Sequence, residues 1–97
     1  MSDYIEQLKG NSTINRLIDN QGNSYGIKVL GRGENLFFQE NEKALICEID
    51  AVNGTIYSKS IKNWEGEKKM STVEQDRIIL LIAKYYKEIY NPNVVIR

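Results

Sequence analysis

The chain has 97 residues, and its 13 basic and 13 acidic residues cancel to a formal net charge of zero. That length fits a single domain, residues 1–97, and the balanced charge disfavours nucleic acid and anionic membranes as partners, because both are held by an excess of Lys and Arg. Histidine is absent and Cys47 is the single cysteine, so an internal disulfide is excluded. We therefore expect no catalytic residues, no metal site and no cofactor.

The N-terminal segment carries no basic region followed by an apolar run, so we expect no signal peptide. The longest apolar stretch, residues 78–83, is much shorter than the ~20 residues that span a bilayer. These features predict a cytoplasmic protein that does not enter a membrane.

The first half of the chain follows the two-residue period of half-buried strands. Residues 4–9 fit either a first strand or a helical turn, and we favour the strand. Residues 13–18 alternate, residues 20–23 form a Gly and Asn turn, and residues 25–29 place Tyr, Ile and Val on one face.

Three further strands are predicted in the middle of the chain. Residues 36–40 form a short strand that directs its two phenylalanines to opposite faces, and residues 44–49 alternate again. Asn53-Gly54 suits a type I′ hairpin turn, after which residues 55–58 return as another strand. Turns this short allow only antiparallel pairing.

The second half changes to a helical period. Ser71 and Glu74 form a capping box that opens a helix over residues 72–90, and Pro92 prevents the helix from continuing. Residues 94–96 are β-branched and predict a final strand or a tail. The apolar face of the helix comprises Ile78, Leu81, Ile82, Tyr85 and Ile89, with Tyr86 and Tyr90 towards its edge.

These elements predict an α+β fold, in which an antiparallel meander of about five strands, within residues 4–58, is covered on one face by the long C-terminal helix. A crossover loop, residues 59–70, holds the only tryptophan, Trp64. We expect Trp64 to close the end of the core, with its indole N–H on a backbone carbonyl. A ligand-stacking role and an interface anchor are the alternatives.

No motif carries chemistry. Gly31-Arg32-Gly33 reads as a turn, since no Gly-Lys-Ser/Thr and no helix follow it, and Cys47 reads as a buried, inert thiol. Five acidic side chains predict a patch on the sheet: Glu34, Glu40, Glu42, Glu48 and Asp50. This patch is either a solvated face or a negative surface for a basic partner, and a hydrolase with paired carboxylates is disfavoured.

Val73 and Leu80, with Arg77 and Lys84, lie on the side of the helix away from the predicted core. An outward apolar pair is either scattered surface or a contact with a partner or a second copy, as in a homodimer.

The arrangement Ser60-Ile61-x-x-Trp64-Glu65, followed by Ser71 and Glu74 at a helix start, resembles the immunity-protein-74 family. These are small bacterial proteins encoded beside polymorphic toxins, and the likeness covers residues from about 25 to 96. The resemblance implies a non-enzymatic protein that neutralises a cognate toxin by binding it. It carries over no toxin-contacting residue.

A strand meander followed by one helix also resembles the coactivator fold related to positive cofactor four, which binds single-stranded nucleic acid. That function needs a basic, aromatic groove on the sheet, whereas residues 34–50 are acidic. The lysines of the crossover loop form a basic rim, but Glu65 and Glu67 interrupt it. We therefore favour a toxin-binding protein, with a basic toxin domain as its partner.

Overall fold

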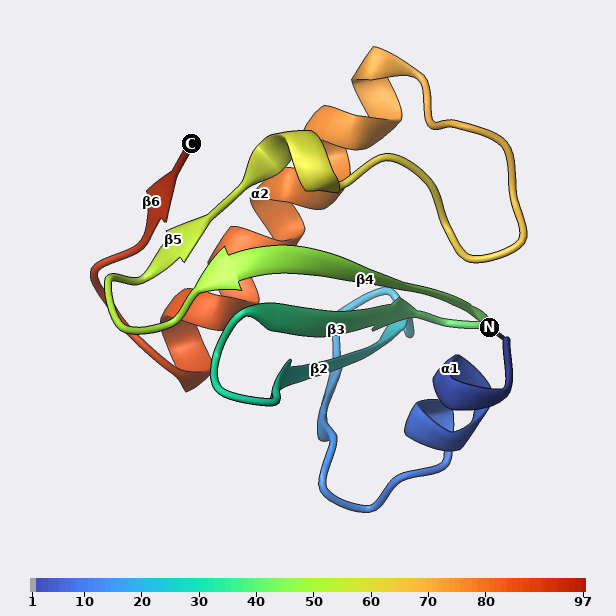
Figure 1. Ribbon diagram of the computed structural model, residues 1–97. Helices are drawn as coiled ribbons and strands as arrows, with labels where there is room; N and C mark the ends of the chain where they lie inside the picture. The colour runs from blue at the N-terminus through green and yellow to red at the C-terminus, as the bar shows by residue number, and fades with distance from the viewer. Residues whose placement is uncertain (1) are drawn as a thin grey trace.

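The part of the chain that the structure describes forms six strands and two α-helices, arranged as in Figure 1. The computed structural model describes residues 2–97, with side chains from residue 4 onward. In chain order the elements are α1 (Ser2–Lys9), β1 (Asn15–Ile18), β2 (Ser24–Leu30), β3 (Asn35–Glu40), β4 (Lys43–Asp50), β5 (Thr55–Ile56), the 3₁₀ turn η1 (Ser58–Ser60), α2 (Thr72–Ile89) and β6 (Val95–Ile96).

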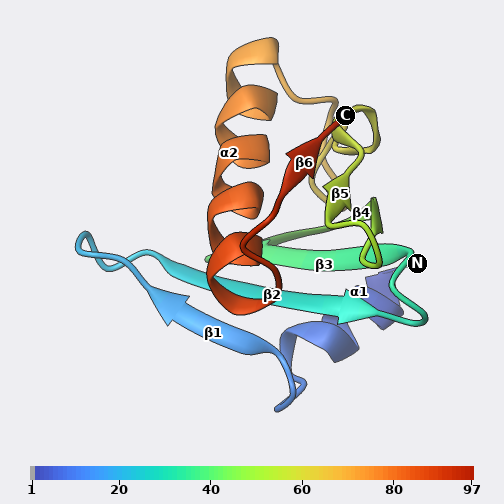
Figure 2. The ribbon, with the colours of Figure 1, turned by 90° about the vertical axis from the view of Figure 1, so that its left-hand side faces the viewer.

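The six strands form one sheet in which every strand lies beside its neighbour in sequence. The pairs from β1 to β5 are antiparallel, because short turns join them, and β6 pairs with β5 in parallel. The whole of α2 lies between β5 and β6 and provides the crossover that a parallel pair requires. In Figure 2 the strands β1 to β4 run beneath α2, while β5 and β6 rise beside it. The predicted α+β class is confirmed.

Both faces of the sheet are covered. The larger core lies between the sheet and α2, and its buried side chains include Ile27, Leu36, Phe38, Ile78 and Ile82. The smaller core lies against α1 and contains Ile5, Leu8, Ile14, Leu30, Phe37 and Ala44. Successive strand residues point to opposite faces, so Phe37 and Phe38 enter different cores, as the sequence predicts.

The strand predicted for residues 4–9 is wrong, because this segment belongs to α1. Ile5 and Leu8 are three residues apart, a spacing that a helix places on one face. Both side chains are 5% exposed, against the face of the sheet that α2 leaves free. The guanidinium of Arg16 on β1 donates to the carbonyl of Lys9 and fixes the end of this helix.

Helix α2 begins where the capping box predicts. The backbone N–H of Glu74 donates to Ser71 Oγ at 3.1 Å, which satisfies one of the free amides of the first turn. The predicted apolar face is buried or half-buried against the sheet. Tyr86 corrects the expectation of an edge position, since it is 2% exposed and packs against Tyr90 with the ring centres 5.4 Å apart.

The turn between β4 and β5 is not the predicted type I′ turn. Asn41 is the only non-glycine residue with positive φ between residues 2 and 97, so Asn53 does not have the conformation that type I′ needs. Instead, Asp50 accepts hydrogen bonds from the backbone and side chain of Asn53. Gly54 is required, because its φ is +67° and a Cβ there would lie 2.5 Å from the Asn93 carbonyl oxygen.

The returning strand ends at Ile56 rather than at residue 58, because the backbone leaves β4 after Tyr57, whose N–H still donates to the carbonyl of Glu48. The N–H of Ser58 donates to the carbonyl of Arg97. Ser60 Oγ accepts the N–H of Glu48 at 2.8 Å. The chain therefore turns into η1 and enters the crossover loop.

Trp64 closes the end of the larger core, as predicted. Its side chain is 2% exposed and stacks on Phe38 with ring centres 6.3 Å apart. The indole N–H donates to Glu74 Oε2 at 3.4 Å, which corrects the expectation of a backbone carbonyl acceptor. This burial argues against a ligand-stacking role and against an interface anchor, since both need an accessible ring face.

Candidate protein-binding surface

The five acidic residues of the predicted patch lie at two opposite ends of the β3–β4 hairpin. The Glu34 carbonyl accepts from the N–H of Ile49, which places Glu34 beside Glu48 and Asp50. Glu40 pairs with Lys43 at the other end, and Glu42 lies in the turn between them. The length of a six-residue strand, about 20 Å, separates the two groups. The sequence therefore predicts one patch where the structure has two.

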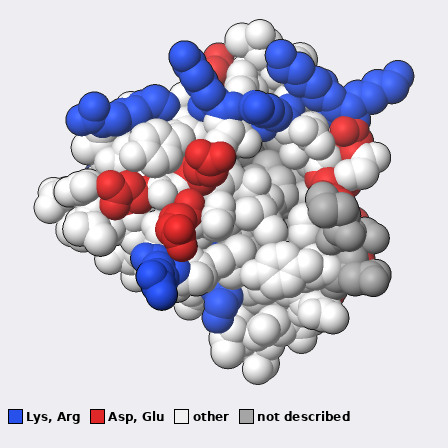
Figure 3. Space-filling view, viewed as in Figure 1, with Lys and Arg blue, Asp and Glu red and all other residues white. Residues whose placement is uncertain are grey.

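The end formed by Glu34, Glu48 and Asp50 is an exposed surface that we call the acidic edge. Glu34 and Glu48 are exposed, and neither forms an ion pair with a residue that the structure describes. Asp50 is half-buried and bound to Asn53. Figure 3 shows a group of acidic side chains over the arrowhead end of β4, with basic side chains above them.

Exposed apolar side chains lie beside the acidic edge. Tyr57, 39% exposed, donates its backbone N–H to the carbonyl of Glu48 and is therefore its neighbour across the strands. Val95 and Ile96 of β6 are each 43% exposed, on the last strand of the sheet. Exposed tyrosine is enriched at protein interfaces, and an unpaired strand edge can pair with another chain.

The other end of the hairpin belongs to a partly exposed ionic network instead. Arg77 of α2 donates to both oxygens of Glu40 at 2.8 Å, and to both oxygens of Glu74 at 2.9 Å. The Tyr25 hydroxyl also donates to Glu40, at 3.2 Å. Burial and the nearby Glu40 carboxylate raise the pKa of Tyr25 to about 12. Glu40 therefore joins α2 to the sheet, and it is not available to a partner.

Arg77→Ala is expected to lower the free energy of unfolding by about 1–3 kcal/mol at neutral pH, because it leaves the Glu40 carboxylate, which is 12% exposed, without its cation. Hydrogen bonds from Arg77 lower the pKa of Glu74 in the folded state. That stabilisation is complete above the ordinary pKa of 4.5 and is lost as the pH falls through the lower folded value.

The Arg77→Ala variant should therefore lose less stability than the wild type as the pH falls below about 4.5. Urea unfolding across this range measures the difference, with the exposed Lys87→Ala on the same helix as the matched control. Equal acid sensitivity in Arg77→Ala and wild type would contradict the role of this network.

All six named residues of the motif that carries the family resemblance have structural contacts: Ser60, Ile61, Trp64, Glu65, Ser71 and Glu74. Ser60 Oγ donates to the carbonyl of Tyr57 and accepts from Glu48, while the side chain of Ile61 is fully buried. Gln75 of α2 donates to the Ile61 carbonyl at 2.7 Å. Glu65 donates its backbone N–H to β4, and Trp64, Ser71 and Glu74 join the loop to α2. The motif thus fixes the crossover loop between sheet and helix.

Cys47 is 1% exposed, and burial raises the pKa of its thiol to about 12, so the thiolate is scarce at neutral pH. We expect the native thiol to react with Ellman's reagent about a thousandfold more slowly than in urea, because access requires unfolding. Comparable rates in the two conditions would show that Cys47 is accessible.

Val73 and Leu80 lie on the outer side of α2, as predicted, and are 80% and 66% exposed. Their role in a homodimer or partner contact stays a prediction. Between residues 2 and 97, no group of three or more metal-ligating side chains comes together. In the same range, neither helix has the length and apolar character needed to cross a membrane.

Comparisons with protein-family models, with curated proteins and with solved structures found no match to this chain. The resemblance to the immunity-protein-74 family therefore stays a prediction, based on the motif Ser60-Ile61-x-x-Trp64-Glu65.

Proposed function

We propose that this chain is a cytoplasmic, non-enzymatic bacterial protein that neutralises a cognate toxin by binding it. The toxin surface would be basic and would dock on the acidic edge. The exposed carboxylates there attract a basic surface over a distance and exclude acidic ones, which gives fast and selective association.

One observation carries this proposal: Glu34 and Glu48 are exposed beside the half-exposed ring of Tyr57, without ion pairs to other described residues. A tyrosine offers a large contact area at a small entropic cost, and it is one of the residues that dominate binding energies. Carboxylates around it supply the charge selectivity.

The packing of α1 argues against the alternative, a single-stranded nucleic-acid binder of the coactivator type. Such a protein stacks bases on aromatic side chains of an open sheet face. Here α1 covers that face, and Phe37 beneath it is fully buried, while Tyr25 and Phe38 are buried under α2. The central strands β2 to β4 therefore offer no aromatic ring for stacking.

The direct test is protection of cells. The reading frame next to the gene would be expressed from an inducible promoter, with and without this protein, and growth would be measured. We expect the neighbouring product to arrest growth and the protein to restore it. Failure to restore growth, with no complex on co-purification, would overturn the proposal. A salt-sensitive mobility shift with oligo(dT) would support the nucleic-acid alternative instead.

A further inference from the structure

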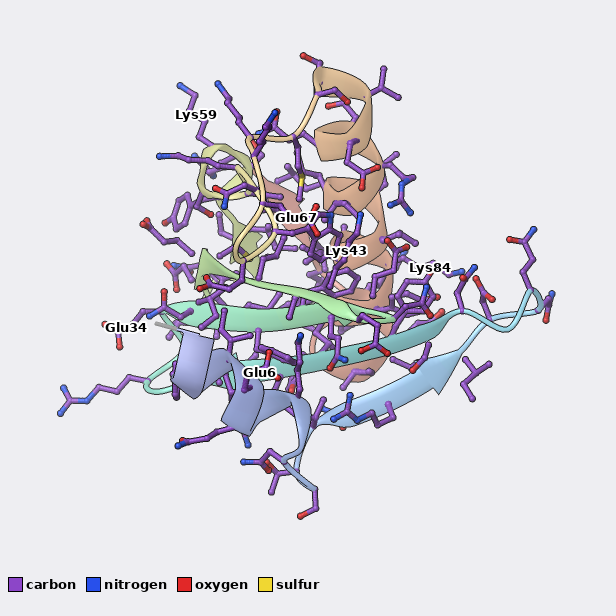
Figure 4. All side chains as sticks on the ribbon, turned by 90° about the vertical axis from the view of Figure 1, so that its right-hand side faces the viewer. Glu6, Glu34, Lys43, Lys59, Glu67 and Lys84 are labelled. Carbon is purple, nitrogen blue, oxygen red and sulfur yellow. The ribbon has the colours of Figure 1, made fainter. Side chains whose placement is uncertain are left out.

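A pocket of about 410 Å³ lies at the edge of β4, and neither Glu34 nor Glu48 lines it. Leu45 and Ile46 contribute its β4 side, and Tyr4 and Ile5 of α1 form one wall. The crossover loop forms the opposite wall. Figure 4 shows α1 below the sheet and the crossover loop above it, so that the pocket lies where the two layers leave the strand edge uncovered.

The pocket forms because the chain that runs beside β4 contains more residues than the stretch of β4 opposite it. Tyr57 N–H donates to the carbonyl of Glu48 at 3.1 Å, and Glu65 N–H donates to the carbonyl of Ala44 at 2.8 Å. Between these two bonds β4 is about 13 Å long. The opposing chain must fit residues 58–64 into the same distance. The surplus bends away from β4, as η1 and as the segment that buries Ile61 and Trp64.

The backbone of Ile46 faces this pocket. In an antiparallel strand, alternate residues direct their N–H and C=O groups to opposite neighbours. Ala44 and Glu48 bond towards the crossover side, so Ile46, midway between them, directs both of its groups to the same side. Neither group has a hydrogen-bond partner among the residues that the structure describes. One donor and one acceptor of a sheet edge therefore lie at the base of a pocket.

The lining combines apolar and polar groups in separate places. Ile5 is 5% exposed and gives the α1 wall an apolar surface, while the Tyr4 ring, 53% exposed, stands at its margin. Lys62 and Glu65 of the crossover loop provide a cation and an anion at the other margin. The volume lies within the range of small-ligand sites.

We propose that this pocket binds one residue of an extended peptide, whose C=O and N–H pair with the N–H and C=O of Ile46. The apolar side chain of this peptide residue lies against Ile5 and Tyr4. The peptide groups on either side of the residue meet Lys62 and Glu65. This is the strand-addition mode of peptide recognition, limited to a single residue by the length of the open edge. The site goes beyond the proposed toxin binding, and it requires neither Glu34 nor Glu48.

The probe is N-acetyl-leucine N-methylamide, which has one leucine side chain and two backbone N–H groups. The control probe, N-acetyl-N-methylleucine dimethylamide, has the same side chain and no N–H. Both are titrated into the whole, ¹⁵N-labelled protein. We expect the first to shift the amide signals of Ile46 and Glu65 with a dissociation constant of about 1 mM, and the control to bind at least about tenfold more weakly. Equal binding of both, or no binding of the first, would overturn the proposal.

Two further measurements separate this site from a nonspecific apolar contact. Without peptide, the Ile46 amide should exchange with solvent about 100-fold faster than the flanking amides of Leu45 and Cys47, which bond to β3. Equal protection would show that the Ile46 N–H already has a partner, and would overturn the proposal. Tyr4→Ala should weaken the probe about threefold or more, while Val73→Ala, exposed on α2, should leave its affinity unchanged. Equal affinity in both variants would also contradict it.

Discussion

Trp64→Ala is expected to lower the free energy of unfolding by about 3–5 kcal/mol, the largest effect of any single side chain described above. The indole is 2% exposed, stacks on Phe38 and joins the crossover loop to α2 through Glu74. Its removal leaves a cavity at the junction of sheet, loop and helix. For a domain of this size the melting temperature should fall by about 15 °C or more.

Two variants separate the contributions of the tryptophan. Trp64→Phe keeps an aromatic ring but removes the N–H that donates to Glu74, so it should cost less than the alanine variant. Val73→Ala on the exposed side of α2 should change the unfolding free energy by less than about 0.5 kcal/mol. Chemical unfolding followed by far-UV circular dichroism measures all three. A Trp64→Ala variant as stable as Val73→Ala would contradict the packing of the crossover loop.

Leu8→Ala is expected to cost about 2–5 kcal/mol, because Leu8 anchors α1 on the second face of the sheet. Its side chain is 5% exposed, in one core with Ile5 and Phe37. Loss of this contact should also expose Phe37, so the amides of β3 and β4 should exchange faster in the variant.

The matched control for Leu8→Ala is Glu6→Ala on the same helix. Glu6 is 65% exposed and forms a surface ion pair with Lys9, which contributes little to stability. Hence Glu6→Ala should cost less than about 1 kcal/mol. If Leu8→Ala costs no more than this control, α1 does not pack on the sheet as described.

The long helix and the main strands were predictable from the spacing of their apolar side chains. In β2 and β4 apolar side chains recur at every second position, and α2 repeats its apolar positions over several turns, so both periods are evident in the sequence. The start of α2 was predictable from Ser71, because a serine three residues before a glutamate is typical of a helix N-terminus. Such local signals need no knowledge of the rest of the chain.

The first helix was not predictable with the same rule, because it has only eight residues and one buried pair at helical spacing. A signal for it nevertheless exists in the strands. Phe37, Ala44 and Ile46 are apolar on the face that α2 does not cover, and an antiparallel sheet with one wet face would have polar residues there. Apolar residues on both faces require a second covering element, and the N-terminal segment was available for it.

The surface residues were less predictable than the fold. The acidic residues between 34 and 50 are close in sequence, but the hairpin places Glu34 and Glu48 at one end and Glu40 at the other. Arg77, which binds Glu40, comes 37 positions later in the chain. Composition alone does not reveal such a pair, because it depends on how the helix packs. The uncovered Ile46 edge similarly depends on the exact register of the crossover loop.

The central claim is that a toxin docks on the acidic edge, and calorimetric titration of the neutralised toxin domain tests it most directly. The Glu34→Lys/Glu48→Lys variant places two cations at exposed positions where the wild type has two carboxylates. We predict about 100-fold weaker binding with an unchanged melting temperature, because like charges would then face each other. Binding as tight as that of the wild type would contradict the claim.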